Sequence, residues 1–166
     1  MIIRTERAED KDEIERITGL GFDASHKDRN IWQLRHASPV ENLCLVADPE
    51  DGETQLLGSI RFWPITIAGI PSVLLGPLAV DPALRGQGIG MALVREGLRR
   101  AESGPWAFCF VSGEPEYYPR LGFSKISASQ LDLPAPIEDE RLHLISVSGN
   151  TINSLPDEKW VIRSDF

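Results

Sequence analysis

The chain has 166 residues, of which 42% are hydrophobic and 25% are charged, so we expect one globular domain over residues 1–166 and exclude a wholly disordered chain. The formal net charge is −8, with 25 acidic against 17 basic residues, and this balance argues against a nucleic-acid ligand, whose phosphates require clustered Lys and Arg. The two cysteines indicate no disulfide framework, and the sequence shows neither an apolar signal region nor a run long enough to span a membrane, which predicts a cytoplasmic protein without membrane contact.

The N-terminal part of the chain has the pattern of a short strand and two helices. Residues 2–4 begin with two isoleucines and predict a short first strand. Asp10, with Glu13 three positions later, resembles a capping box and predicts that a helix begins there. Gly21 is expected to end this helix, and a second helix is predicted over residues 25–36.

A meander of antiparallel strands is predicted next. Apolar runs bounded by turn-rich segments, such as the Asp-Pro-Glu-Asp-Gly segment at residues 48–52, are typical of strands. These runs cover residues 43–47, 55–67 and 73–80. Strands that follow one another through short turns pair in the antiparallel sense.

The chain changes character at a glycine-rich loop over residues 85–90. Residues 89–102 then have apolar positions at helical spacing, and Gly104-Pro105 is expected to end that helix. Residues 106–111 form another apolar run. The order is therefore strand, helix, strand, which favours parallel pairing of the two strands.

The remainder of the chain carries weaker signals. We predict, in chain order, a short helix over residues 115–120, a strand over 123–126, a Pro-rich loop over 131–140 and a strand over 142–147. The tail after Gly149 shows no pattern that favours either a helix or a strand.

The glycine-rich loop is a candidate phosphate site. The first N–H groups of a helix lack intrahelical partners and carry partial positive charge, so a helix start of this kind suits a phosphate or pyrophosphate. No Lys follows the glycines as in a P-loop, and Met91 stands where a dinucleotide fingerprint needs its third glycine. The alternative is a glycine turn that only packs the helix against the sheet.

Three segments with distinctive letters follow one another in the chain. They are Leu-Gly-Pro-Leu-Ala-Val-Asp-Pro at residues 75–82, Arg-Gly-Gln-Gly-Ile-Gly at 85–90 and Tyr-Tyr-Pro-Arg-Leu-Gly-Phe at 117–123. In this order they resemble three landmarks of the GNAT superfamily of acetyl-CoA-dependent N-acetyltransferases: the fourth strand and its turn, the Q/R-x-x-G-x-G/A loop, and the aromatic-Tyr-x-x-x-Gly-Phe segment. The resemblance covers residues 74–126 and does not firmly cover the residues that follow.

This resemblance implies an α+β fold, with a mixed, mostly antiparallel central sheet of about six to seven strands flanked by about four helices, and with splayed fourth and fifth strands. It implies that the backbone of Leu78, Ala79 and Val80 pairs with the pantetheine arm of acetyl-CoA. It also implies that the loop holds the pyrophosphate, through Arg85, Gly86, Gln87, Gly88, Ile89 and Gly90. No metal is implied.

Pro77, preceded by Gly76, supports the splay independently, because Pro within a strand marks an edge, a bulge or a strand start. A kinked strand would leave backbone groups free for a ligand. The alternative is a strand that simply begins at Leu78.

Tyr118 is the candidate general acid. The resemblance implies that it lies near the thioester sulfur, and an ordinary tyrosine pKa of about 10 keeps its hydroxyl protonated at neutral pH. The alternative is that the ring only packs against the sheet. The expected oxyanion donor is a backbone N–H of the fourth strand.

The general base is not identified by the sequence. Many relatives in the superfamily place a Glu on the fourth strand, and residues 73–78 contain no carboxylate. Glu114 and Glu116 could act directly or through a water that Ser112 positions. His26 and His36 are further candidates, in the region that covers the substrate in relatives. An amine delivered already neutral would need no dedicated base.

We therefore expect an N-acetyltransferase that uses acetyl-CoA as cosubstrate and a primary amine as acceptor, without a metal. The alternatives are an acyl-CoA-binding or sensing module of the same fold without turnover, and a nucleotide-binding protein with a different loop chemistry. The acceptor stays open between an amino acid, a polyamine, an aminoglycoside-like drug and a protein amine. A homodimer is consistent with the resemblance.

Overall fold

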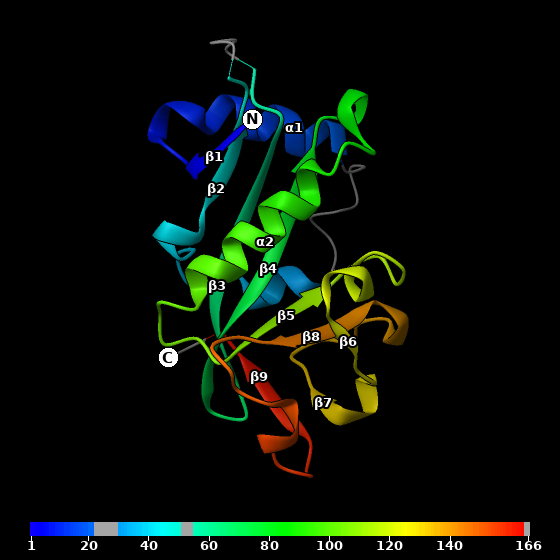
Figure 1. Ribbon diagram of the computed structural model, residues 1–166. Coiled ribbons are helices and arrows are strands. Elements are labelled where there is room, and N and C mark those ends of the chain that lie inside the picture. The colour runs from blue at the N-terminus through cyan, green and yellow to red at the C-terminus, as the bar shows by residue number, and fades with distance from the viewer. Residues whose placement is uncertain (22–29, 51–54, 165–166) are drawn as a thin grey trace.

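The computed structural model describes residues 1–21, 30–50 and 55–164, and a mixed β-sheet with two α-helices dominates it (Figure 1). The strands are β1 (Ile2–Thr5), β2 (Leu45–Asp48), β3 (Gly58–Ile67), β4 (Ile70–Val80), β5 (Phe108–Ser112), β6 (Ser124–Lys125), β7 (Leu131–Asp132), β8 (Leu142–Ser146) and β9 (Trp160–Arg163). The α-helices are α1 (Lys11–Gly21) and α2 (Ile89–Ala101). The strand order is β1-β2-β3-β4-β5-β8-β6, with β9 paired to both β3 and β7.

Strands β2, β3 and β4 form the antiparallel meander that the sequence predicts, and β1 pairs antiparallel with β2. The crossover from β4 to β5 runs through α2, and β5 pairs parallel with β4, as the strand-helix-strand order requires. β8 then pairs antiparallel with the other edge of β5.

The two α-helices cover opposite faces of the sheet. On β2, Val46 belongs to the cluster in which α1 buries Ile14 and Ile17. Its neighbours Leu45 and Ala47 belong to the cluster on the α2 side, because successive strand residues point to opposite faces. Figure 1 shows α2 lying across the face of the sheet turned toward the viewer.

Close packing fixes α2 on the sheet. At Gly97, an added Cβ would lie 2.4 Å from the Phe62 ring, so only a residue without a side chain lets the helix approach β3 this closely. Phe62 itself is fully buried. The start of α2 is therefore held at a defined height above β4, which positions the loop that precedes it.

The described residues hold nine strands and two α-helices, not the six to seven strands and four helices expected. Residues 25–29 lie outside the described part, and the rest of the predicted second helix is a 3-10 helix over Asn30–Leu34. The predicted helix at 115–120 is a 3-10 helix over Tyr118–Leu121. Such short segments form too few hydrogen bonds to offset α-helix nucleation. Within the described ranges, no helix has the length and apolar character needed to cross a bilayer.

The additional strands lie in the C-terminal part of the chain. β7 falls inside the predicted loop, and β9 falls in the tail without a predicted element. Leu131 of β7 pairs with Trp160 of β9, and Ile162 of β9 pairs with Ile67 of β3. Strands this short offer too few positions for alternation to be visible in the sequence, and they form through pairing.

The start of α1 agrees with the prediction, but the expected Asp10–Glu13 capping box does not form. The Asp10 carboxylate accepts a hydrogen bond from the backbone N–H of Arg7 at 2.7 Å and two from the guanidinium of Arg4 at 2.8 and 2.9 Å. Glu13 instead accepts from the backbone N–H of Leu56 at 3.1 Å. Both carboxylates thus tie the helix start to neighbouring segments.

Candidate functional site

A cleft with a volume of about 760 Å³ opens where β4 and β5 separate. The two strands pair only at Val73–Cys109 and Leu74–Phe110. Beyond this point β4 continues to Val80 with β3 on one edge and the cleft on the other. The structure therefore has the splay of the fourth and fifth strands that the sequence predicts.

A bulge in β4 accompanies the splay. Phe62 of β3 lies opposite Leu75 and Ile60 lies opposite Leu78, so β4 uses one more residue than β3 over this interval. Gly76 and Pro77 supply the bulge, and Gly76 has a φ of 135°, in the region that favours glycine. The strand does not begin at Leu78, so that alternative is wrong.

The bulge also changes which side chains face α2. Before it, Val73 and Leu75 belong to the core cluster under α2. After it, Leu78 and Val80 pack on that same cluster, whereas Ala79 joins the cluster under α1. A shift of one residue exchanges the two faces of a strand. The bulge therefore decides which backbone and side-chain groups of β4 border the cleft.

The structure brings nearly all the predicted cofactor residues together on one cleft. Its lining includes Leu78, Ala79, Val80, Arg85, Gly86, Gly88, Ile89 and Gly90. Gln87 is exposed and does not line the cleft. The role of these residues in holding a cofactor stays a prediction.

The glycines of the loop serve different purposes. Gly86 and Gly88 have φ values of 85° and 81°, and no atom lies within 4 Å of an added Cβ at either position. Gly88 is the N-cap of α2, whose first turn contains no acidic residue. An anion could therefore approach this helix start without meeting a side chain at Gly86 or Gly88 or an acidic residue of the first turn.

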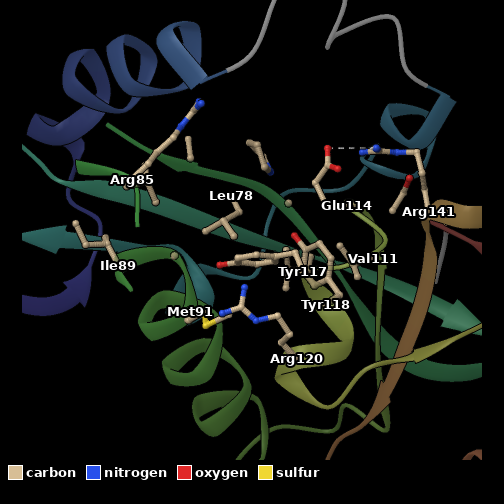
Figure 2. A pocket seen from close by; sticks show the side chains of 18 of the residues that line it. Leu78, Arg85, Ile89, Met91, Val111, Glu114, Tyr117, Tyr118, Arg120 and Arg141 are labelled. Carbon is tan, nitrogen blue, oxygen red and sulfur yellow. Dashed lines mark ion pairs between the residues drawn. The ribbon is translucent and has the colours of Figure 1, made fainter. Parts of the chain in front are cut away.

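Gly90 makes room for a neighbouring tyrosine. An added Cβ there would lie 2.7 Å from the hydroxyl oxygen of Tyr117. The Tyr117 ring is half-buried and lines the cleft between α2 and β4. Figure 2 shows Tyr117 and Tyr118 side by side, between Leu78 of β4 and Val111 of β5.

Tyr118 is 6% exposed and lines the cleft. Its ring packs edge-on against Tyr117 and Phe123, with ring centroids 5.1 and 5.4 Å away, and the buried His143 ring lies tilted at 39° with its centroid 5.6 Å away. Gly113 leaves the space that the ring fills, because an added Cβ would meet it at 2.1 Å. Burial raises the pKa of the Tyr118 hydroxyl above its usual range. The hydroxyl therefore stays protonated at neutral pH.

Only some of the candidate bases reach the cleft. Glu114 lines it, as does Ser112, the residue expected to position a water, whereas Glu116 and His36 are exposed and do not. His26 lies outside the described residues. The Glu114 side chain is 77% exposed and pairs loosely with Arg141 at 3.7 Å (Figure 2). The described part of the chain thus offers no buried carboxylate in the cleft.

Sequence reasoning assigned no role to Arg35. The structure places its side chain in the cleft lining, next to Trp32. The two residues are three positions apart, on the same side of a helical turn as the buried Ile31. The sequence signal that could have identified Arg35 is its helical spacing from Ile31, which places a charged residue on an apolar face.

The arrangement suits a long ligand with an anionic end. The free edge of β4 can pair with an extended chain, the open helix start can hold a diphosphate, and Arg85 adds an exposed positive charge at the loop. In the described ranges, no three residues of the types His, Cys, Asp or Glu come together as a metal site.

Comparisons with known proteins agree with this geometry. A family model described as an acetyltransferase (GNAT) domain matches residues 41–125. YhbS of Escherichia coli K12, described as an uncharacterized N-acetyltransferase, is 28% identical over 157 residues, which cover 93% of this chain and 92% of YhbS.

Two solved structures resemble the fold closely. The crystal structure of E. coli YhbS in complex with CoA superimposes with a TM-score of 0.78 at 26% identity, over 98% of this chain and 88% of that one. A GNAT family acetyltransferase from Brucella melitensis in complex with acetyl-CoA gives a TM-score of 0.67 at 30% identity, over 96% of this chain and 93% of that one.

Proposed function

The chain belongs to the GNAT acetyltransferase family, and on this premise we propose that it transfers the acetyl group of acetyl-CoA to a primary amine. Similar proteins of known structure hold CoA in one case and acetyl-CoA in the other. This likeness supports acetyl-CoA as the donor.

The observation that carries the proposal is the continuity between the free edge of β4 and the open helix start of α2. Both border the same cleft. The backbone of Leu78–Val80 would hold the pantetheine arm, and the amides from Gly86 to Gly90 would hold the diphosphate. Nothing lies within 4 Å of an added Cβ at Gly86 or Gly88, so the space that the diphosphate needs is available.

In the proposed reaction, a C–N bond forms to the acyl carbon while the C–S bond breaks. Tyr118 donates a hydrogen bond and then its proton to the departing sulfur, and it regains a proton from solvent. The burial that raises the pKa of Tyr118 also disfavours a free thiolate beside it. The departing thiolate therefore attracts the Tyr118 proton more strongly than it would in water, although the tyrosine is the weaker acid of the two.

The proposed reaction uses no buried base. Glu114 is the carboxylate among the predicted bases that borders the cleft, and it is mostly in water beside Arg141. We place the loss of the ammonium proton at this open side, to water or to Glu114. The amine then reaches the acyl carbon in its neutral form.

The absence of a carboxylate on β4 favours a second candidate, an acyl-CoA-binding module of the same fold without turnover. Release of free thiol from acetyl-CoA distinguishes the two. The protein is incubated with acetyl-CoA and a panel of amines, with a heat-denatured sample as control. Amine-dependent thiol release supports the transferase, and CoA binding without release supports the module.

Three further expectations stay predictions. They are a cytoplasmic location, a homodimer and the absence of a metal from the reaction. Dialysis against a chelator should leave thiol release unchanged, and loss of release that added metal restores would contradict the last expectation.

A further inference from the structure

Among the residues that the structure describes, Arg35 is a cation in the cleft without a counter-ion. Its Nε and Nη1 atoms are buried and have no hydrogen-bond partner, and no ion pair to Arg35 occurs among the described residues. Buried polar groups in native proteins are nearly always paired, so this guanidinium requires an explanation.

The surrounding residues hold the guanidinium in place. The Trp32 ring lies under it, with the Cζ atom 4.1 Å from the ring centroid, and the Trp63 ring is 5.9 Å away. The Nη2 atom occupies the space in front of Gly76, 2.6 Å from where a Cβ would be. Trp63 donates a hydrogen bond from Nε1 to the Gly76 carbonyl at 2.5 Å. Two aromatic rings and a bulge therefore fix the position of this charge.

The charge survives this burial. Loss of hydration lowers the pKa of Arg35 to about 10, which still leaves the side chain cationic at neutral pH. A mostly buried cation without a partner destabilises the protein until an anion joins it. A planar guanidinium matches the geometry of a carboxylate better than any other side-chain cation does.

The position of Arg35 indicates which ligand supplies the anion. Gly76 lies two residues before Leu78 along β4, on the side away from the glycine loop. Tyr118 lines the same cleft as Arg35 and Gly76. Arg35 is thus beside the reacting end of the cleft, beyond the segment proposed for the pantetheine arm.

We propose that the acceptor is an amine that also carries a carboxylate, and that Arg35 binds this carboxylate while the amine faces the acyl carbon. This inference rests on the proposed acetyl transfer. It selects an amino acid or a short peptide over a polyamine or an aminoglycoside, because a cation at this position repels acceptors that carry only positive charge.

The first test uses the unmodified protein and matched acceptors. Each of a set of L-amino acids and dipeptides is compared with its C-terminal amide and its decarboxylated amine, by thiol release from acetyl-CoA. The carboxylate-bearing member should have the higher kcat/KM, by about ten-fold or more, since a hydrogen bond between charged groups is lost in the others. Equal kcat/KM values for the acid, the amide and the decarboxylated amine of each set would overturn the proposal.

The second test uses Arg35→Gln, with Arg99→Gln as the control. Arg99 lies on α2 with a side chain that is 67% exposed and pairs only with a residue of its own helix. Arg35→Gln should reduce the preference for carboxylate over amide to near unity, and Arg35→Lys should restore part of it, while Arg99→Gln keeps it. A preference that survives in Arg35→Gln would overturn the proposal.

A binding measurement separates this inference from the proposed function. Calorimetry of the same amino acids and amides with the CoA-loaded protein does not depend on turnover. If no amine releases thiol, the transferase proposal fails, but tighter binding of the carboxylate member that is lost in Arg35→Gln still supports the role of Arg35. Binding of neither member, or equal binding of both, would overturn it.

Discussion

At the scale of single residues, the cleft depends on side chains held by burial and on positions that lack a side chain. Tyr118 is fixed by two aromatic neighbours and by the space at Gly113. Gly86 and Gly88 leave the helix start uncovered. In the proposed reaction the first arrangement would serve the departing sulfur and the second would hold the diphosphate, so the two can be tested separately.

Replacement of Tyr118 by Phe should lower turnover while cofactor binding persists. The ring and its contacts remain, and only the proton donor is lost, so we expect a decrease in kcat of about ten-fold or more with a nearly unchanged Kd for CoA. Thiol release and calorimetry measure the two quantities, and the melting temperature serves as the folding control. Unchanged turnover would remove Tyr118 from the mechanism.

Replacement of Gly88 by Glu should abolish CoA binding, because a carboxylate would occupy the place of the diphosphate. The variant also forces a residue with a side chain into a positive φ. Gly149→Glu is therefore the matched control, since Gly149 has a φ of 75°, open surroundings and no part in the cleft. Calorimetry with CoA should show binding for the control and none for Gly88→Glu. Intact binding in Gly88→Glu would contradict the assigned geometry.

Sequence reasoning located these residues because their signals are local. The glycines before a predicted helix and the tyrosine in the 117–123 segment can be recognised from residue type and spacing alone. Arg35 was not found, because its importance comes from Trp63 and Gly76, which lie far along the chain and meet it only in the folded sheet.

At the scale of elements, the decisive features are the bulge of β4 and the close contact of α2 with β3. From Gly76 and Pro77, the sequence allowed either a kinked fourth strand or a strand that begins at Leu78. The register between β3 and β4 shows that the strand is continuous and bulged. The βαβ unit followed from its order of elements. The strand predicted over residues 123–126 contains β6, whereas β7 and β9 were not predicted, because they are set by pairing partners rather than by their own pattern.

Replacement of Gly97 by Ala should destabilise the protein by about 2 kcal/mol, because the added methyl group would press on the buried Phe62 ring. Gly19→Ala is the matched control: Gly19 lies in α1 with nothing within 4 Å of an added Cβ. That change should leave stability unchanged or raise it by about 1 kcal/mol. Urea unfolding measures both. Equal effects of the two variants would show that the contact with Phe62 does not limit the approach of α2.

At the scale of the whole molecule, ion pairs join the N-terminal elements to the sheet. Arg4 of β1 binds Asp10 ahead of α1 and also Asp48 of β2, at 2.8 Å in each case. The hydrogen bonds from Arg4 are the main cause that lowers the pKa of Asp10 below its ordinary value of 3.8. The carboxylate of Asp10 is therefore bound more tightly in the folded chain than in the unfolded one.

The resulting pH dependence has a defined sign. Because the folded pKa of Asp10 is lowered, its contribution to stability is fully present above about pH 4, where the unfolded chain is ionised, and is lost as the pH falls through the folded pKa. Asp10→Asn should cost about 2 kcal/mol at pH 7 and should flatten the decline of stability in acid. Urea unfolding from pH 7 to pH 2 measures both effects.

Glu9→Gln is the control for this prediction. Its exposed pair with Arg7 spans 3.5 Å, so the change should alter stability by less than about 0.5 kcal/mol. An acid decline that is as steep in Asp10→Asn as in the unmodified chain would contradict the assignment.

A crystal structure of the protein grown with CoA tests the central claim most directly. The account predicts diphosphate oxygens on the main-chain amides between Gly86 and Gly90, and a pantetheine arm beside Leu78–Val80 that ends near the Tyr118 hydroxyl. Coenzyme bound elsewhere on the molecule, or a cleft that remains without it at saturating concentration, would contradict the account.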